Sequence, residues 1–391
     1  MAQLAEIRER RARFRAFMAR LDGAGDPERA VTQGLYVEQP GEVARQIVAR
    51  LDLRPSATQL IVGGIGTGKT TQLHVARERL LERLPDAVAI YLDVSAHQDL
   101  ARLQPGTLLA LAGLQLAKWA EECKTTNSFR DSFTRWAHGR HADFPDFGDG
   151  DPDFIPGVVT PPDEGLPYEL RYRRDELQEF IAESLSDREI VLFIDSLDRT
   201  TDMTAFQTLV EQDMVALSST GIGLVVVGPL HAIYGLHRAV LDRFDRIYRQ
   251  PAVNLAPDSD GLRFLVDILR KRVDADLLPD PGCHVLAHWS GGVLRDLIRL
   301  AHQAGEEAYV DGADRIDLHH VTRAADTFGR SLLMGLSADE IDKLRAIRNS
   351  GKFVETSEED LALLVTRRVL DYQDGAAARY GVHPTLEPLL A

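Results

Sequence analysis

A glycine-rich segment followed by Lys-Thr-Thr carries the residues best suited to chemistry in this sequence. Residues 63–70 have the pattern Gly-x-x-x-x-Gly-Lys-Thr, which is that of a phosphate-binding loop. Its backbone N–H groups can turn inward around a polyphosphate, while Lys69 can reach the β and γ phosphates and the Thr70 hydroxyl can hold Mg²⁺. We therefore predict nucleotide contacts from the following residues: Gly63, Gly64, Ile65, Gly66, Thr67, Gly68, Lys69, Thr70 and Thr71.

The segments on either side of this loop agree with that interpretation. The apolar run 60–62 predicts a strand before it, and Leu73, Ala76 and Leu80 have the spacing of one helix face after it. A chance glycine-rich turn would not need a strand, a Lys-Thr pair and an amphipathic helix in this order. A nucleotide-binding loop is therefore the preferred interpretation.

A second apolar segment ends in an acid. Residues 190–194 are consecutive apolar residues followed by Asp195, which predicts a strand buried on both faces of a parallel sheet with its carboxylate at the C-terminal edge. There Asp195 is expected to orient water on a Mg²⁺ ion opposite Thr70. Asp198 follows within the same Asp-Ser-Leu-Asp-Arg segment.

Four further residues are weaker candidates. Tyr36 and Val37 precede the loop and could form an apolar wall for an adenine ring, although simple core packing explains them equally well. Arg243 and Arg246 are candidates for an arginine finger that reaches a γ-phosphate on a neighbouring protomer. Surface ion pairs are the commoner use of such arginines.

Composition restricts the class of protein. The 391 residues carry a formal charge of −15, which argues against a surface coated in nucleic acid but leaves a local basic face open. The 44% hydrophobic content is that of soluble globular proteins, and no apolar run reaches membrane-spanning length. Two cysteines, Cys123 and Cys283, suit a reducing compartment. We expect a cytoplasmic protein with no membrane partner.

The patterns divide the chain into four regions. We predict an N-terminal basic helix over 1–22, a P-loop core over 23–255, a helical lid over 256–330 and a winged-helix domain over 331–391. Residues 142–167, rich in Asp, Pro and Gly, predict a long exposed loop. The fold class is thus α/β: a P-loop NTPase parallel sheet sandwiched by helices, followed by an all-α lid and a winged helix. Other elements expected in the core are strands over 87–94, 223–227 and 247–253 and helices over 107–122 and 175–184, with no periodicity between 125 and 170.

Together these motifs resemble AAA+ and STAND-type ATPases. The layout is similar to that of origin-recognition-type initiators and of the NACHT, NB-ARC and KAP classes, over roughly residues 34–391. The resemblance implies ATP or ADP with Mg²⁺ as ligands, Lys69 and Thr70 as Walker A residues and Asp195 as the Walker B aspartate. Gly-Gly-x-x-Arg at 291–295 makes Arg295 similar to a sensor 2 arginine. His383, in Val-His-Pro, is similar to the histidine of the STAND Met-His-Asp motif, which touches the β-phosphate of ADP; an ordinary winged-helix histidine is the alternative.

Departures from the family pattern predict slow hydrolysis. Ser196 stands where AAA+ enzymes keep a catalytic glutamate, so water activation falls to Asp198 or is poor, and Gly228-Pro229 offers no sensor 1 side chain. We predict a Mg²⁺-ATP-binding switch that controls homo-oligomer assembly or a separate effector protein, with antiviral defence as a setting. The alternatives are a DNA-binding AAA+ ATPase of the initiator or transposition-loader type, and a binding module without turnover.

Overall fold

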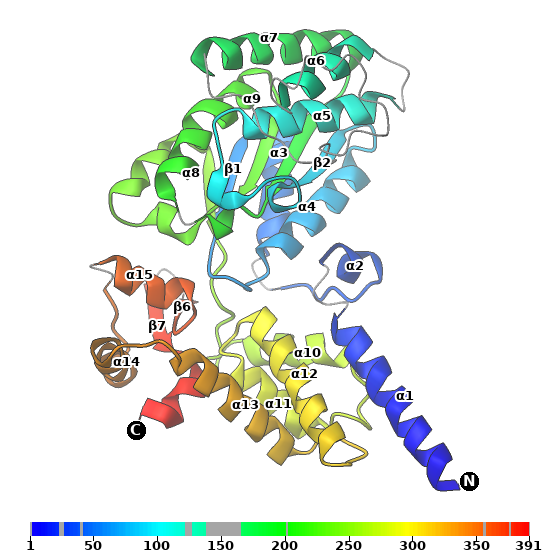
Figure 1. The fold of residues 1–391 in the computed structure, drawn as a ribbon, viewed down its shortest axis with the longest axis vertical. Helices are drawn as coiled ribbons and strands as arrows, with labels where there is room; N and C mark the ends of the chain where they lie inside the picture. The colour runs from blue at the N-terminus through cyan, green and yellow to red at the C-terminus, as the bar shows by residue number, and fades with distance from the viewer. Residues whose placement is uncertain are drawn as a thin grey trace. The chain divides into compact units, whose positions relative to one another are not determined.

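The chain forms two compact units, drawn in Figure 1. The computed structural model describes residues 2–22, 27–39, 42–121, 127–137, 166–200, 202–354, 357–374 and 377–390. One unit, here the sheet unit, comprises Val43–Val62 and Gln72–Arg249. The other, here the helical unit, comprises Met1–Glu42, Gly63–Thr71 and Gln250–Ala391. The phosphate loop therefore belongs to the same unit as the C-terminal helices.

The sheet unit is built on five parallel strands in the order β2-β3-β4-β1-β5. Their bounds are β1 Thr58–Val62, β2 Val88–Asp93, β3 Ile190–Asp195, β4 Gly223–Val227 and β5 Arg246–Arg249. Every residue of β1, β3 and β4 is buried, as expected for central strands whose two faces are both covered. The α/β fold class predicted from the sequence is confirmed.

Helices cover both faces of this sheet. Helices α3 (Val43–Leu53) and α4 (Lys69–Arg83) cover one face. The Gln59 side chain of β1 donates a hydrogen bond to Ile47 O of α3, and the Arg77 side chain of α4 donates one to Ala89 O of β2. On the other face, strand residues such as Leu192 share one apolar core with α5 (Thr107–Glu121), which lies in front of the strands in Figure 1. The remaining helices of the unit are α6 Asn127–Ala137, α7 Leu166–Ser184, α8 Met203–Leu209 and α9 Val215–Ser219.

Helix α6 lies where no periodicity was expected, so that prediction is wrong. Its Phe129, Phe133 and Trp136 are buried and spaced as on one helix face, and the Phe129 ring stacks on Phe180 of α7 at a centroid distance of 4.1 Å. The aromatic stripe was present in the sequence. Neighbouring proline and acidic residues concealed it, because they lowered the average hydrophobicity of the region.

Two further boundaries differ from the prediction. Helix α7 begins at Leu166 rather than at 175, with Pro167 in its first turn, a position where proline is tolerated because the first N–H groups have no partner within the helix. Strand β5 ends at Arg249 rather than at 253. Arg249 pairs with Val62, the last residue of β1, so the strand ends where its partner β1 turns into the phosphate loop. The rest of the predicted loop, 142–165, lies outside the described residues.

A buried carboxylate caps α5. Asp213 lies in a π-helical turn, Val210–Met214, and accepts hydrogen bonds from Gly106 N at 2.8 Å, Leu108 N at 2.9 Å and Leu109 N at 3.1 Å. Burial raises the pKa of Asp213 to about 6, although these amide hydrogen bonds lower it. An unfolded aspartate titrates near pH 4, so the folded protein holds this proton more tightly than the unfolded chain does. The resulting contribution to the free energy of unfolding is fully present below about pH 4 and is lost as the pH rises through about 6.

Replacing Asp213 by alanine leaves three amide groups at the start of α5 without an acceptor in a buried place. We expect the free energy of unfolding to fall by about 3 kcal/mol. The matched control is Asp202→Ala, which removes the exposed cap of α8 and is expected to cost about 1 kcal/mol. Urea unfolding at neutral pH measures both, and equal losses would contradict the assignment.

The helical unit combines the N-terminus with the chain after β5. Its helices are α1 Ala2–Asp22, α2 Pro27–Thr32, α10 Gly261–Arg270, α11 Asp280–Trp289, α12 Leu294–Val310 and α13 Leu318–Leu333. Helix α1 packs along α12, where the buried Phe17 ring closes over Gly305. The helix predicted over residues 1–22 therefore lies on its own chain.

The last part of the helical unit, here the C-terminal module, contains α14 (Ala338–Ser350), α15 (Glu358–Val365) and the antiparallel hairpin of β6 (Val369–Asp374) and β7 (Ala377–Val382). Ser337 and Glu340 form the predicted capping box of α14. This is the element order of a winged-helix domain; that assignment and the four predicted domain boundaries stay predictions. Within the described residues, no helix has the length and apolar character that crossing a bilayer requires.

Candidate nucleotide-binding site

The phosphate loop joins the end of β1 at Val62 to the start of α4 at Lys69, the order that the sequence predicted. Gly66 and Gly68 have φ angles of +86° and +98°, which glycine adopts without strain. Thr67 Oγ1 donates to Gly64 O at 2.9 Å and stabilises the turn. The glycines are therefore required by the backbone path as well as by any ligand.

The Lys69 ammonium group is held by the loop itself. The side chain is buried, and Nζ donates to Gly63 O at 2.9 Å and to Gly64 O at 2.8 Å. Phosphate oxygens can replace these neutral carbonyl acceptors with stronger, charge-assisted hydrogen bonds. Lys69 is thus placed to serve a polyphosphate bound at the loop.

Helix α12 begins against the phosphate loop, within the helical unit. Arg295, its second residue, donates its backbone N–H to Gly66 O at 3.1 Å. A Cβ added at Gly66 would lie 2.6 Å from Arg295 Cβ, and one at Gly68 would lie 2.8 Å from Leu294 Cδ1. The structure therefore brings Arg295 to the loop, while a contact between its guanidinium and a phosphate stays a prediction.

Gly66→Ala tests this close approach. The new methyl group would adopt a left-handed backbone and collide with Arg295, so we expect the free energy of unfolding of the helical unit to fall by about 3 kcal/mol. Gly335→Ala is the control, because Gly335 has a φ of +81° but no atom within 4 Å of the added Cβ. It should cost about 1 kcal/mol. Urea unfolding compares the two, and similar losses would mean that the loop does not pack on α12.

Gln250 connects the phosphate loop to the segment that contains Tyr36 and Val37. Its buried side chain donates from Nε2 to Gln39 Oε1 at 3.0 Å and to Thr67 O at 3.4 Å. These hydrogen bonds link that segment to the phosphate loop, and contacts of Tyr36 and Val37 with adenine stay a prediction. Sequence reasoning missed Gln250, since no spacing marks a glutamine that follows an edge strand.

Asp195 lies at the C-terminal end of β3 in the sheet unit, as predicted. It is 3% exposed, and it accepts hydrogen bonds from Tyr91 Oη at 2.8 Å and from Ser196 N at 2.7 Å. Strand β2 ends in a second acid, Asp93, which pairs in register with Asp195. Two carboxylates therefore share one edge of the sheet, and oxygen donors are the ligands that Mg²⁺ prefers.

Hydroxyl groups immobilise Asp93. Its Oδ1 accepts from Ser196 Oγ at 2.6 Å, Ser95 Oγ at 2.7 Å and Ser95 N at 3.0 Å. Burial raises the pKa of Asp93, but these hydrogen bonds and the charge of Arg199 outweigh it and hold the pKa below its usual value. Ser196 has a φ of +74°, and strained residues of this kind cluster at functional sites. The sequence identified Asp93 only as the end of a strand.

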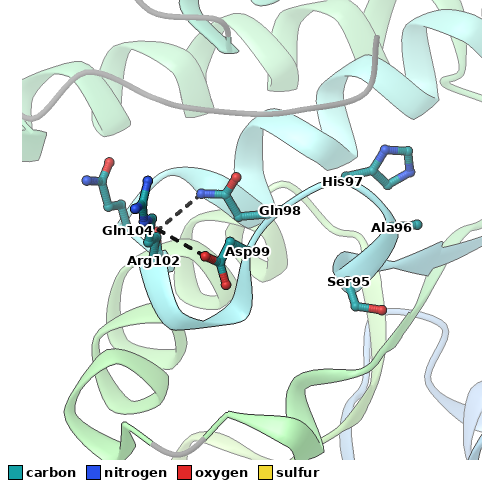
Figure 2. Close-up of a pocket in the computed structure, with 7 residues that line it drawn as sticks. All are labelled: Ser95, Ala96, His97, Gln98, Asp99, Arg102 and Gln104. Atoms are coloured by element: carbon teal, nitrogen blue, oxygen red, sulfur yellow. Dashed lines mark hydrogen bonds and ion pairs between the residues drawn. The ribbon is translucent and has the colours of Figure 1, made fainter. Parts of the chain in front are cut away.

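A pocket opens at the segment that follows β2, and Figure 2 shows the residues that line it. It has a volume of about 510 Å³ and is lined by Ser95, Ala96, His97, Gln98, Asp99, Arg102 and Gln104. Gln98 Nε2 donates to Arg102 O at 3.2 Å, and Arg102 Nε lies 3.8 Å from Asp99 Oδ2. Ser95, which lines this pocket, is also the residue that donates to Asp93.

Three other candidates also lie in the sheet unit. Asp198 is half-buried in the 3₁₀ turn Leu197–Arg199. Arg243 and Arg246 are exposed, Arg243 at the end of a 3₁₀ segment and Arg246 at the start of the edge strand β5. Exposed arginines suit contact with another chain, but the finger role and the water-activating role of Asp198 stay predictions.

His383 is fully buried at the end of β7. Its Nδ1 lies 2.8 Å from Thr385 Oγ1, and its Nε2 lies 3.6 Å from Oδ2 of Asp296, the residue after Arg295 on α12. Asp296, itself 0% exposed, also pairs at 3.2 Å with Arg367, which has a φ of +62°. His383 thus contacts α12; its contact with ADP stays a prediction. Sequence reasoning missed Asp296 and considered Arg367 only as a basic residue suited to DNA, because no local pattern connects the two.

Asp311, His319 and His320 gather possible metal-ligand atoms within 4.8 Å of one another. However, His320 Nδ1 accepts the Asp317 N–H at 3.0 Å, so the neutral ring carries its proton on Nε2. That nitrogen faces Asp311 at 3.4 Å. A nitrogen that carries a proton does not bind a metal, so we interpret this group as a polar cluster in which Arg323 pairs with Asp311 at 2.7 Å.

The five-stranded parallel sheet, the phosphate loop after β1 and the helices after β5 give the chain the α/β fold that the sequence predicted. Its sequence matches no protein-family model and no curated protein.

Solved structures with a similar fold include a chain of Drosophila ORC bound to DNA, at 14% identity and a TM-score of 0.44, covering 92% of this chain and 89% of that chain. The Aeropyrum pernix ORC1 protein in complex with DNA has 16% identity and a TM-score of 0.42, covering 91% and 93%. Domain III of Thermotoga maritima DnaA has 16% identity and a TM-score of 0.41, covering 74% and 93%. Similarity at this level concerns the fold alone.

Proposed function

We propose that this protein is a Mg²⁺-ATP-binding, slowly hydrolysing switch of the AAA+ or STAND type. One observation carries the proposal. The first turn of α12 contacts the phosphate loop through Arg295 and the C-terminal module through Asp296. Adjacent residues of one rigid helix therefore join the nucleotide loop to a separate structural module.

Nucleotide binding follows from the loop. Lys69 and the backbone N–H groups of residues 63–71 would hold the phosphates, and Thr70 with Asp195 would hold Mg²⁺. A bound Mg²⁺ ion would neutralise part of the negative charge on the β and γ phosphates. Because Ser196 replaces a carboxylate next to Asp195, we expect turnover to be slow.

The switch would operate through α12. Gly291, just before this helix, packs against Leu370 and Pro384, and its carbonyl accepts from Tyr372 Oη at 2.9 Å. We expect the γ-phosphate of ATP to interact with Arg295 in one conformation of the protein and not in another. Binding of ATP would then shift the start of α12, and with it the β6–β7 hairpin. His383 acts in this scheme through Asp296.

The output we propose is assembly of several copies of the chain or control of a separate effector protein. Arg243 and Arg246, both exposed, would then face a nucleotide on a neighbouring copy. Antiviral defence is the setting that the resemblance to STAND proteins suggests.

A DNA-binding ATPase of the initiator or loader type is the second candidate. The order of α14, α15 and the β6–β7 hairpin favours it, since winged helices commonly grip DNA. Two basic residues suited to that task are used internally: Arg367 pairs with Asp296, and Arg368 donates to Leu332 O and Met334 O. The first turn of α15 is acidic, with Glu358, Glu359 and Asp360. We therefore prefer the switch.

Three measurements on the purified protein test the proposal. ATP-dependent assembly, followed by mass photometry with ATP and with ADP, supports the switch. Salt-dependent binding of duplex DNA in a mobility shift, without ATP-dependent assembly, supports the loader instead. Failure to bind ATP at all would overturn both.

A further inference from the structure

Two cationic side chains at the end of α10 hold three consecutive backbone carbonyl groups near the N-terminus. Lys271 Nζ donates to Gly34 O at 3.2 Å and to Tyr36 O at 2.7 Å. Arg272, which is 6% exposed, donates from Nη1 to Leu35 O at 3.1 Å. A cation at a helix end ordinarily binds the last carbonyls of its own helix. These contacts to a distant part of the chain are therefore more than the capping of α10 requires.

Gln250 holds the other end of the same segment. Its side chain is 3% exposed, and Nε2 donates to Gln39 Oε1 at 3.0 Å and to Thr67 O in the phosphate loop at 3.4 Å. All of these residues belong to the helical unit, so the contacts lie within one compact unit. Residues 34–39, here called the strap, are thus fixed at both ends, and one of those ends is tied to the phosphate loop.

The strap carries apolar side chains that folding leaves partly exposed. Leu35, Tyr36 and Val37 are all half-buried, although the backbone that bears them is held by charged groups. Tyr36 Oη donates to the carboxylate of Glu42, which is 5% exposed, and this hydrogen bond fixes the ring. A flat nucleobase packs well on an aromatic and apolar surface. Because this surface is ordered before a ligand arrives, binding costs less conformational entropy.

We propose that Lys271, Arg272 and Gln250 are positioning residues for the base half of the nucleotide site. They hold the strap so that Tyr36 and Val37 pack on the base while the phosphate loop takes the triphosphate. The inference rests on the proposed nucleotide-binding function and adds the ligand class: a nucleoside triphosphate whose base is read, rather than any polyphosphate. Loss of the strap contacts should therefore weaken binding of ATP but not of a bare polyphosphate.

Titration with ATP and with inorganic tripolyphosphate, both in Mg²⁺, separates the two halves of the site. Lys271→Met removes the ammonium group of an exposed residue and keeps an unbranched apolar side chain. We expect its Kd for ATP to rise about tenfold, because the charge-assisted hydrogen bonds that fix the strap are lost. Its Kd for tripolyphosphate should change less than about twofold. Lys352→Met, at an exposed lysine of the same unit, should change neither value.

Each failure of this experiment has its own signature. Lys69→Ala is the comparison, since it should weaken the binding of both ligands. Unchanged ATP affinity in a folded Lys271→Met overturns the inference, and so does an equal loss for the two ligands, which would place the effect at the phosphate loop. If wild type binds ATP no more tightly than tripolyphosphate, the inference fails while phosphate binding stands. If wild type binds neither ligand, the proposed function fails and the inference fails with it.

A second variant covers the case in which thermal melting shows Lys271→Met to be unfolded. Val37→Ser changes a half-buried side chain and leaves the hydrogen bonds of the strap backbone in place. We expect the Kd for ATP to rise about fivefold because the base loses apolar contact area, with the Kd for tripolyphosphate unchanged. Unchanged ATP affinity in a folded Val37→Ser overturns the proposal.

Discussion

Replacing Asp296 by alanine is expected to lower the free energy of unfolding of the helical unit by about 3 kcal/mol. Asp296 is 0% exposed and pairs with Arg367 at 3.2 Å and His383 at 3.6 Å, whose side chains are 13% and 0% exposed. Neither Asp296 oxygen receives a hydrogen bond from the residues described, so the ion pair with Arg367 is what balances its buried charge. Removing the Asp296 carboxylate leaves the Arg367 guanidinium buried without its counter-charge, and an uncompensated buried charge is strongly destabilising.

The control for Asp296→Ala removes an equal charge from a surface pair. Asp326 bonds Arg330 at 2.9 Å on α13, with side chains 48% and 69% exposed, and Asp326→Ala should change stability little. Urea unfolding gives both values. A double-mutant cycle with Arg367→Ala should show coupling of about 2 kcal/mol. Additive effects of the two substitutions would show that Asp296 and Arg367 do not interact in solution.

Lys69→Ala is expected to weaken ATP binding at least about 30-fold and to reduce ATP turnover to background. In this structure Lys69 Nζ donates to Gly63 O and Gly64 O, so the ammonium group is held at the loop before a nucleotide arrives. Alanine removes the charge that would bridge the β and γ phosphates, and the remaining N–H groups carry only partial charges.

Lys118→Ala is the control for that experiment, because Lys118 is an exposed residue of α5. It should leave ATP affinity and turnover within about threefold of wild type. Nucleotide titration and a phosphate-release assay measure the two quantities. Equal turnover in wild type and Lys69→Ala would mean that any hydrolysis comes from a contaminant.

Local patterns made much of the fold predictable. Strands β3 and β4 are continuous apolar runs because both faces of the sheet are covered, and the phosphate loop is recognisable because its glycines, Lys69 and Thr70 are consecutive. Helix α6 was missed because its three aromatic residues lie in a polar region. The end of β5 was misplaced because it depends on where β1, far away in the chain, stops offering partners.

The supporting residues of the site could not be predicted, because they meet through tertiary structure. The Ser196–Asp93 hydrogen bond joins residues 103 positions apart, and that between Gln250 and Thr67 joins residues 183 apart. Asp296 follows a recognisable arginine, yet nothing local indicates that Arg367 and His383 face it. Register and packing, rather than residue type, bring these groups together.

We propose that the C-terminal module responds to the occupant of the phosphate loop. Hydrogen–deuterium exchange of the β6 and β7 amides, measured with Mg²⁺-ATP, with ADP and without nucleotide, tests it most directly. We predict that the exchange protection of the hairpin differs between ATP and ADP in wild type and is independent of nucleotide in Lys69→Ala. Identical protection in all three states of wild type, at nucleotide concentrations that saturate the loop, would contradict the switch.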